Sequence, residues 1–163
     1  MRTLKEDVVF QEVPNEVSLL FQITGCPLRC KGCHSEELWD ENNGAKLTDS
    51  YFEKKIIEYR SLITCVLFFG GEWDQAELVA KLKIAKRYGL KTCLYSGFNF
   101  ISGPIYAYLD YLKIGPWREG RGGLDSRKTN QQFIQIETGN VLNYLFWKDE
   151  EENTIMEERH AYA

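Results

Sequence analysis

Long apolar runs, histidine and a basic excess are all scarce in this sequence, and each absence excludes a class of protein. No apolar run approaches the roughly 20 residues that a helix needs to cross a bilayer. Only two histidines occur among the 163 residues. Residues 148–163 hold six acidic and two basic residues, so residues 1–147 carry 18 of each sign. A body without a basic excess gives no support to direct nucleic-acid binding. We therefore expect a protein that neither enters a membrane nor binds nucleic acid directly.

The sequence also lacks internal repeats and any linker rich in proline or serine. Hydrophobic residues make up 44% of the chain and charged residues 27%, which is typical of a soluble globular protein. A length of 163 residues suits one domain. We therefore expect residues 1–147 to form a single domain and residues 148–163 to form an acidic C-terminal tail.

The five cysteines are an odd number, and the first residues contain no secretory leader. Both observations disfavour a disulfide framework and indicate reduced cysteines in the cytoplasm. Cys65 and Cys93 lie in apolar, strand-like runs. We expect both to be core residues, because a free cysteine packs as a small hydrophobe.

The other three cysteines, Cys26, Cys30 and Cys33, have the spacing Cys-x-x-x-Cys-x-x-Cys and follow an alternating apolar run at 17–23. A loop with this spacing can place three thiolates around one [4Fe–4S] cluster, which has four corners. One iron would then stay open, as one position does in catalytic zinc sites. A structural zinc site is the alternative. Its fourth ligand would have to be His34, directly beside Cys33, or His160 in the acidic tail.

Apolar runs alternate with helical patterns along residues 16–114. Strands are predicted at 16–24, 63–69, 90–95 and about 111–114, with a short edge strand within 8–13. Helices are predicted at 48–62, with Ser50 and Glu53 in capping-box spacing, and from Asp74 to a stop at Gly89, with Asp74 and Glu77 in the same spacing. A short helix is expected to start within 102–104, and apolar runs follow at 133–136 and 141–147.

Alternating strands and helices imply a parallel sheet. A closed eight-unit barrel takes about 250 residues, so residues 17–147 provide enough chain for only about four units. The predicted fold is therefore α/β, a partial, open (βα) barrel with a mostly parallel sheet. Its chemistry is expected at the carboxyl ends of the strands, where the cysteine motif also lies.

These strand ends carry a family resemblance. The sequence resembles the radical S-adenosylmethionine enzymes, and more narrowly the activating proteins of anaerobic ribonucleoside-triphosphate reductases. The resemblance rests on the cysteine motif at 26–35, on Gly70-Gly71-Glu72, on Tyr95-Ser96-Gly97, and on the segments 113–116 and 129–133. It implies an open barrel of the radical S-adenosylmethionine type. No further group of cysteines is present for an auxiliary cluster.

The resemblance implies an oxidoreductase that activates a glycyl-radical enzyme. Its cofactors would be a [4Fe–4S] cluster, bound by Cys26, Cys30 and Cys33, and S-adenosylmethionine. Reductive cleavage of S-adenosylmethionine would give a 5′-deoxyadenosyl radical, which would install a glycyl radical on the large subunit of the anaerobic (class III) ribonucleotide reductase. A flavodoxin or ferredoxin would supply the electron. No catalytic residue is implied beyond those that bind the cluster and the cofactor.

The resemblance also implies a set of cofactor contacts beside the cysteine motif and at the strand ends. Glycines there permit a close approach of the backbone to a ligand. The implied contacts are Gly32, Cys33 and His34 near the adenine, Gly70, Gly71 and Glu72 along the methionine part, and Tyr95 and Ser96.

Other interpretations of these residues remain. The chain could be another small radical S-adenosylmethionine enzyme, either a different glycyl-radical activase or a deazapurine-type synthase, or it could be a non-catalytic iron–sulfur electron carrier. The Gly70-Gly71 pair alone would also suit an ordinary turn, and His34 would suit a polar surface position. Trp73 and Trp117 could either flank the site or pack in the core.

A glycine-rich basic loop from 115 to 128 follows the fourth predicted strand. We expect Arg118, Arg121 or Arg127 to meet either the carboxylate of the cofactor or acidic groups of the partner. A solvated loop without such a role is the alternative.

Overall fold

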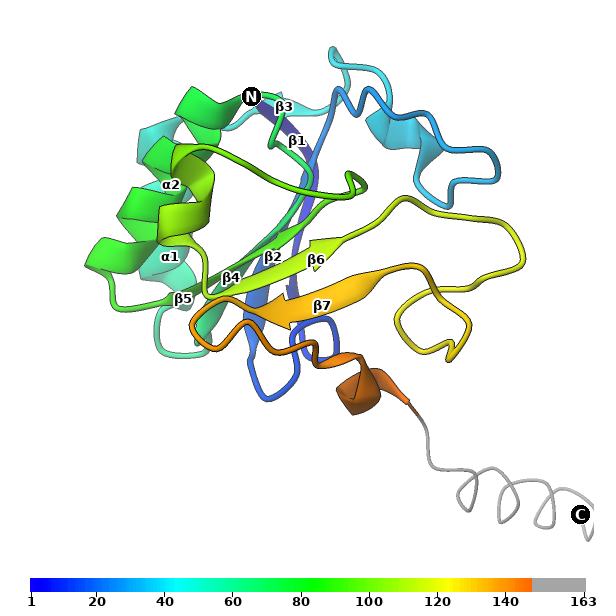
Figure 1. Ribbon diagram of the computed structural model, residues 1–163. Coiled ribbons are helices and arrows are strands. Elements are labelled where there is room, and N and C mark those ends of the chain that lie inside the picture. Colours follow the sequence, from blue (N-terminus) through cyan, green and yellow to red (C-terminus); the bar gives the residue numbers. More distant parts are fainter. Residues whose placement is uncertain (148–163) are drawn as a thin grey trace, which may run out of the picture.

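Seven strands form one open sheet in the order β3-β1-β2-β4-β5-β6-β7 (Figure 1). The computed structural model describes residues 1–147, so the predicted acidic tail lies outside the described residues. The four strands β2, β4, β5 and β6 are parallel, whereas β1 and β3 on one side and β7 on the other are antiparallel to their neighbours. The strands are β1 (Arg2–Val9), β2 (Ser18–Ile23), β3 (Ala45–Lys46), β4 (Cys65–Phe69), β5 (Lys91–Tyr95), β6 (Tyr111–Ile114) and β7 (Gln132–Gln135).

Two α-helices, α1 (Asp49–Tyr59) and α2 (Gln75–Arg87), lie side by side against one face of the sheet (Figure 1). Three short 3-10 helices complete the regular structure of the described residues: η1 (Glu36–Leu38), η2 (Pro104–Tyr108) and η3 (Asn143–Phe146). Within residues 1–147 no helix has the length and apolar character needed to cross a membrane.

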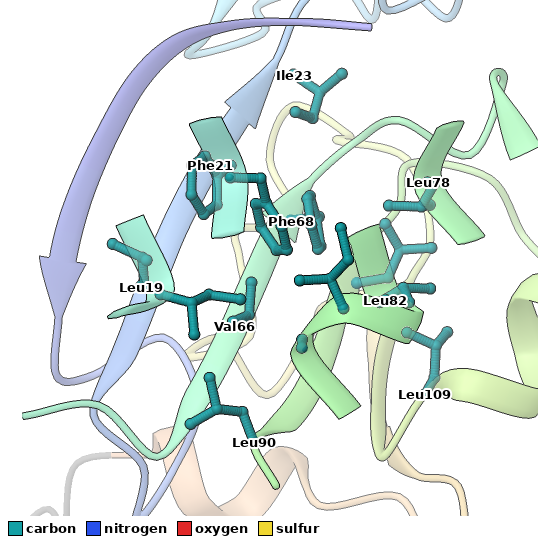
Figure 2. Packing of buried hydrophobic residues seen from close by; sticks show 14 of the residues in the cluster. Leu19, Phe21, Ile23, Val66, Phe68, Leu78, Leu82, Leu90 and Leu109 are labelled. Carbon is teal, nitrogen blue, oxygen red and sulfur yellow. The ribbon is translucent and has the colours of Figure 1, made fainter. Parts of the chain in front are cut away.

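The main core fills the space between the sheet and the two helices. Alternate residues of the strands point into it, as Leu19, Phe21 and Ile23 do from β2 (Figure 2). The rings of Phe21, Phe52 and Phe68 form its centre, with centroids 5.1 to 5.8 Å apart. The intervening strand residues build a smaller cluster on the other face, where Cys65 and Cys93 are fully buried as predicted.

Local sequence signals explain the helix boundaries, with one correction. The backbone N–H of Glu77 donates to the side chain of Asp74, so Asp74 is the predicted N-cap of α2, and Gly89 follows the end of this helix with a φ of +71°. The predicted cap of α1 at Ser50 is wrong. Thr48 accepts from the N–H of Tyr51, and it can do so because its own backbone is extended.

Other predictions differ from the structure at the sheet edges. The first strand runs over Arg2–Val9 instead of 8–13, and on its outer side only Arg2 and Thr3 are paired, by β3, so the rest of it lies at the edge of the sheet. The mixed polar sequence of this strand gave no strand signal. Backbone pairing, and not an apolar pattern, holds the strand in the sheet. The expected helix near 102–104 is the 3-10 turn η2, which ends where Leu109 becomes extended. The open α/β sheet was predicted correctly, and the specific radical S-adenosylmethionine barrel stays a prediction.

The packing predicts unequal effects for two phenylalanines. Phe68→Ala should lower the free energy of unfolding by about 3–5 kcal/mol, because it removes a fully buried ring that contacts Phe21 and Phe52. Phe100 is 75% exposed, so Phe100→Ala should change the free energy of unfolding by less than about 0.5 kcal/mol. Urea denaturation followed by circular dichroism measures both, and equal losses would contradict the described core.

Candidate functional site

The residues 25–34, which we call the cysteine loop, follow the end of β2 directly. The N–H groups of Gly25 and Cys26 both donate to the carbonyl oxygen of Leu38, at 2.8 and 3.0 Å. The N–H of Cys33 donates to the carbonyl of Cys30 at 3.1 Å. These bonds fix the path of the loop, so three cysteines that are at most seven positions apart come to line one cavity.

This cavity, which we call the cysteine cavity, has a volume of about 300 Å³ and lies at the carboxyl ends of β2, β4, β5 and β6. Parallel strands bring their ends to the same edge of a sheet, which is why residues so far apart in sequence meet there. The predicted site residues that line the cavity are Cys26, Cys30, Cys33, His34, Gly70, Glu72, Tyr95 and Ser96.

Two predicted contacts, Gly32 and Gly71, do not line the cavity. Both have positive φ values, +67° and +106°, so they shape the turns on either side of it. Gly70 is more constrained, because a Cβ on it would lie 2.4 Å from the Cη2 atom of Trp73. Glycine at this position therefore lets the Trp73 ring close one side of the cavity.

Glu72 is the buried acid of the cavity, with 6% of its surface exposed. The hydroxyl of Ser96 donates to its Oε1 at 2.5 Å, whereas its Oε2 is buried without a hydrogen-bond partner in the described structure. Burial raises the pKa of the Glu72 carboxyl, and the Ser96 bond and the Lys113 charge oppose this only in part. A carboxylate with one satisfied and one unpaired oxygen is prepared to accept a donor from a ligand.

Ser96 and Tyr95 both line the cavity, and the hydroxyl of each is held by a hydrogen bond. The Ser96 hydroxyl donates to Glu72 and accepts from the N–H of Phe98, so it holds the carboxylate in position. The Tyr95 hydroxyl donates to the backbone carbonyl of Glu12, away from the cysteines. Only the ring of Tyr95, stacked on Phe69 with centroids 4.8 Å apart, forms the wall of the cavity.

Lys113 is a site residue that the sequence interpretation did not single out. It lies in β6, next to the end of that strand, and lines the same cavity as the cysteines. Burial lowers the pKa of its ammonium to about 8, and the nearby Cys30 and Glu72 counteract this shift. Its Nζ donates to the carbonyl of Gly115 at 3.0 Å and forms no ion pair within 4.0 Å among residues 1–147. Its position at the end of a predicted strand is the sequence signal that points to it.

His34 and Trp117 form the outer wall of the cavity. Their ring centroids lie 4.3 Å apart, and a Cβ on Gly32 would lie 3.7 Å from the Nε1 atom of Trp117. Trp73 and Trp117, the two tryptophans considered in the sequence analysis, thus both line the cavity.

None of the three arginines of the loop 115–128 lines the cavity in the described structure. The Arg127 guanidinium instead stacks on the ring of Trp147 at 4.5 Å.

The donor set fits a four-iron cluster better than a single ion. Within residues 1–147 no three histidine, cysteine or acidic side chains converge closely enough to hold one metal ion, as a zinc site would require. Three thiols that share a cavity without converging on one point suit a cluster that has a separate iron at each corner. The N–H of Ser35 already donates to the Sγ of Cys33 at 3.4 Å, a bond that would stabilise a thiolate ligand.

Residues 16–112 match the family model described as a 4Fe-4S single cluster domain. The chain belongs to this family. The match begins before β2 and ends within β6, so it includes the cysteine loop and the Gly70 turn. Membership supports the predicted iron–sulfur cluster over the zinc alternative, while the individual ligands Cys26, Cys30 and Cys33 remain predictions.

Two curated relatives are similar over a shorter segment. The pyruvate formate-lyase 1-activating enzyme of Escherichia coli (strain K12) is 34% identical over 76 residues, which make up 43% of this chain and 31% of that enzyme. The pyruvate formate-lyase-activating enzyme of Clostridium pasteurianum is 32% identical over 76 residues, or 43% of this chain and 32% of that enzyme. The chain thus matches about a third of the length of these relatives.

The unpaired Glu72 oxygen predicts a gain in stability when its charge is removed. In the metal-free protein, Glu72→Gln should raise the free energy of unfolding by about 1 kcal/mol at pH 7.5, because a buried carboxylate with an unmet hydrogen bond opposes folding. The folded-state pKa of Glu72 is raised, so the gain should shrink as the pH falls below that pKa and should be lost only below the ordinary pKa of an unfolded glutamate. Urea titrations at pH 7.5 and pH 5 measure this change.

The exposed Glu137 provides the matched control for this experiment. Glu137→Gln should leave the free energy of unfolding unchanged within about 0.5 kcal/mol at both pH values. A loss of stability in Glu72→Gln at pH 7.5 would show that the carboxylate is not the unfavourable group described here.

Proposed function

We propose that this chain is a radical S-adenosylmethionine activase that installs a glycyl radical on the large subunit of an anaerobic ribonucleotide reductase. The observation that carries the proposal is one cavity lined by three thiols together with an unpaired carboxylate oxygen and a partly buried ammonium group. In this proposal Cys26, Cys30 and Cys33 bind three irons of the cluster. A flavodoxin or ferredoxin is the proposed electron donor.

The cluster and S-adenosylmethionine, when bound, supply the difficult chemistry, which is one-electron cleavage of the sulfonium and removal of a hydrogen atom from a glycine. The protein's own residues would bind these two groups, orient them and shield them from water. The rings of Phe69, Trp73 and Trp117 form apolar walls that keep water from the reacting groups. Radical chemistry depends on this shielding, since a free radical that meets other groups is quenched.

Glu72 and Lys113 match the amino-acid end of S-adenosylmethionine. The two side chains are close enough to influence each other's pKa, yet they form no ion pair with each other. Each is therefore available to a ligand of the opposite charge. We assign the Glu72 carboxylate to the ammonium group of the cofactor and the Lys113 ammonium to its carboxylate, with Ser96 as the residue that positions Glu72.

The choice of target rests on two kinds of support. Similarity to two pyruvate formate-lyase-activating enzymes supports an activase of a glycyl-radical enzyme in general, and it makes pyruvate formate-lyase the second candidate target. The segments 113–116 and 129–133 resemble the reductase activases more narrowly. Lys113 and Gln131, from these two segments, line the cysteine cavity. The narrower resemblance is the support for the reductase as the first candidate target.

Cysteine substitutions test the chemistry. Alanine at Cys26, Cys30 or Cys33 should reduce bound iron well below the about four atoms per chain of a complete cluster. Each variant should also abolish 5′-deoxyadenosine formation with dithionite and S-adenosylmethionine under anaerobic conditions. Cys93→Ala is the matched control, because that thiol is fully buried and does not line the cavity, and it should retain iron and activity. Undiminished cleavage in any of the three loop variants would refute the proposal.

Electron paramagnetic resonance decides the target. The reduced protein is mixed with S-adenosylmethionine and with either the reductase large subunit or pyruvate formate-lyase. A glycine-centred doublet is expected with the reductase subunit. A doublet with pyruvate formate-lyase alone would establish the second candidate, and cleavage without a doublet in either protein would indicate a different substrate.

A further inference from the structure

The outer side of the cysteine loop lies against a second loop that carries basic residues. Lys31 lies between Cys30 and Cys33 in the sequence, and its side chain is 92% exposed. Its Nζ atom lies 3.5 Å from the Oε2 atom of Glu119, in the loop 115–128 that projects beyond the sheet between β6 and β7 (Figure 1). Neither Lys31 nor Glu119 lines the cysteine cavity. The two loops therefore meet outside the cavity and next to it.

The loop 115–128 and Lys31 together form a positively charged surface, which we call the basic surface. Its basic residues are all exposed: Lys31, Arg118, Arg121, Arg127 and Lys128. Glu119 and Asp125 are its acidic residues, so its net charge is +3. Lys31 pairs with Glu119, and the other four basic residues form no ion pair within 4.0 Å among residues 1–147. Four positive charges are thus available to an anionic ligand.

The residues that follow the described part of the chain have the opposite charge. Residues 148–163, the acidic tail, hold six acidic and two basic residues, which gives a net charge of −4. Four of the acids are consecutive, at 149–152. Residues 1–147 carry equal numbers of both signs. In this balanced body the basic surface is a local excess of positive charge, and the acidic tail complements it.

The acidic tail also starts beside the basic surface. The Arg127 guanidinium stacks over the ring of Trp147, the last described residue, at 4.5 Å. Phe146 packs against the smaller core cluster, to which Leu124 of the same loop belongs. An extended chain spans at most about 3.6 Å per residue, so the five residues after Trp147 reach no farther than about 18 Å from it. The run 149–152 is thereby confined to the neighbourhood of the basic surface.

We propose that the acidic tail binds to the basic surface of its own chain, with the run 149–152 against Arg118, Arg121 and Lys128. The bound tail covers the outer side of the cysteine loop and competes there with other acidic proteins. An acidic electron donor would have to displace the tail before it approached the cysteines. This inference goes beyond the proposed function, because none of the three basic residues lines the cysteine cavity and the contact needs no cluster.

Zero-length cross-linking of the full chain tests the contact directly. A carbodiimide joins a carboxylate to a lysine amine that it touches, and mass spectrometry identifies the joined residues. At low salt we expect links from the acids of the tail to Lys128 or Lys31. These links should fall about fivefold in about 1 M salt, which shortens the Debye length to about 3 Å. Lys54, exposed on α1, is the matched control and should give no link to the tail.

The same experiment can contradict the proposal in two ways. Links from the tail to Lys54 that are as abundant as those to Lys31 and Lys128, or no links to these two lysines, would overturn it. Linked dimers on a denaturing gel would place the tail on a second copy of the chain, and they would overturn the contact within one chain.

Charge reversal of the basic surface provides a second test of the contact. The double variant Arg118→Glu and Arg121→Glu should reduce the links from the tail to Lys128 about fivefold, because it places two negative charges beside the acidic run. The control Arg60→Glu and Lys83→Glu, at two exposed positions on α1 and α2, should change these links less than about twofold. Circular dichroism checks that both double variants fold. Equal links in the two variants would overturn the inference.

Binding of poly-L-glutamate measures the competition. The triple variant Glu150→Gln, Glu151→Gln and Glu152→Gln should raise the affinity of the full chain for this polyanion about fivefold at low salt, because it exposes the basic surface. The gain should be lost in about 1 M salt.

A second triple variant controls for net charge. Asp7→Asn, Glu58→Gln and Glu137→Gln remove the same number of charges at exposed positions outside the two loops, and together they should raise the affinity less than about twofold. Equal gains in the two triple variants would show that only the net charge matters, and would overturn the competition. None of these measurements requires iron or S-adenosylmethionine. A protein that fails to cleave S-adenosylmethionine would refute the proposed function, and these outcomes would still decide the contact of the tail.

Discussion

The contact between the cysteine loop and the end of β5 is the constraint on which the rest of the site depends. A Cβ on Gly97 would lie 2.4 Å from the Cδ1 atom of Leu28, so the absence of a side chain at residue 97 leaves room for the Leu28 side chain against this strand end. Leu28 lies between Cys26 and Cys30 in the sequence, so its position in the structure determines where both thiols lie. The parallel strands then bring Glu72 and Lys113 to the same place, since their ends share one edge of the sheet.

The chemistry of the cavity opposes the stability of the empty protein. Glu72 has an unpaired oxygen. Burial raises the pKa of Glu72 and lowers that of Lys113, and both shifts favour the neutral form of the group. Groups of this kind are retained where a ligand will meet them, and they are balanced by packing elsewhere. In this protein the compensating stability comes from the three phenylalanine rings packed between the sheet and the helices. These rings lie away from the cavity.

The sequence predicted those parts of the molecule that local patterns determine. The buried run of β4 and the Asp74 cap of α2 are encoded within a few neighbouring residues, and both were predicted correctly. The strand β3 could not be predicted, because it has two residues and depends entirely on pairing with β1. Lys113 escaped notice for a similar reason: only the fold places this lone lysine beside Glu72 and the cysteines.

The burial of Cys65 and Cys93 has a consequence for damage by air. Burial raises the pKa of the Cys65 thiol to about 12 and that of Cys93 well above its usual value, so both stay protonated and shielded at neutral pH. Oxidants reach exposed thiols most easily, and the three thiols of the cysteine loop are only partly buried. Oxidation is therefore expected first in the cysteine loop, while the sheet beneath it keeps its packing.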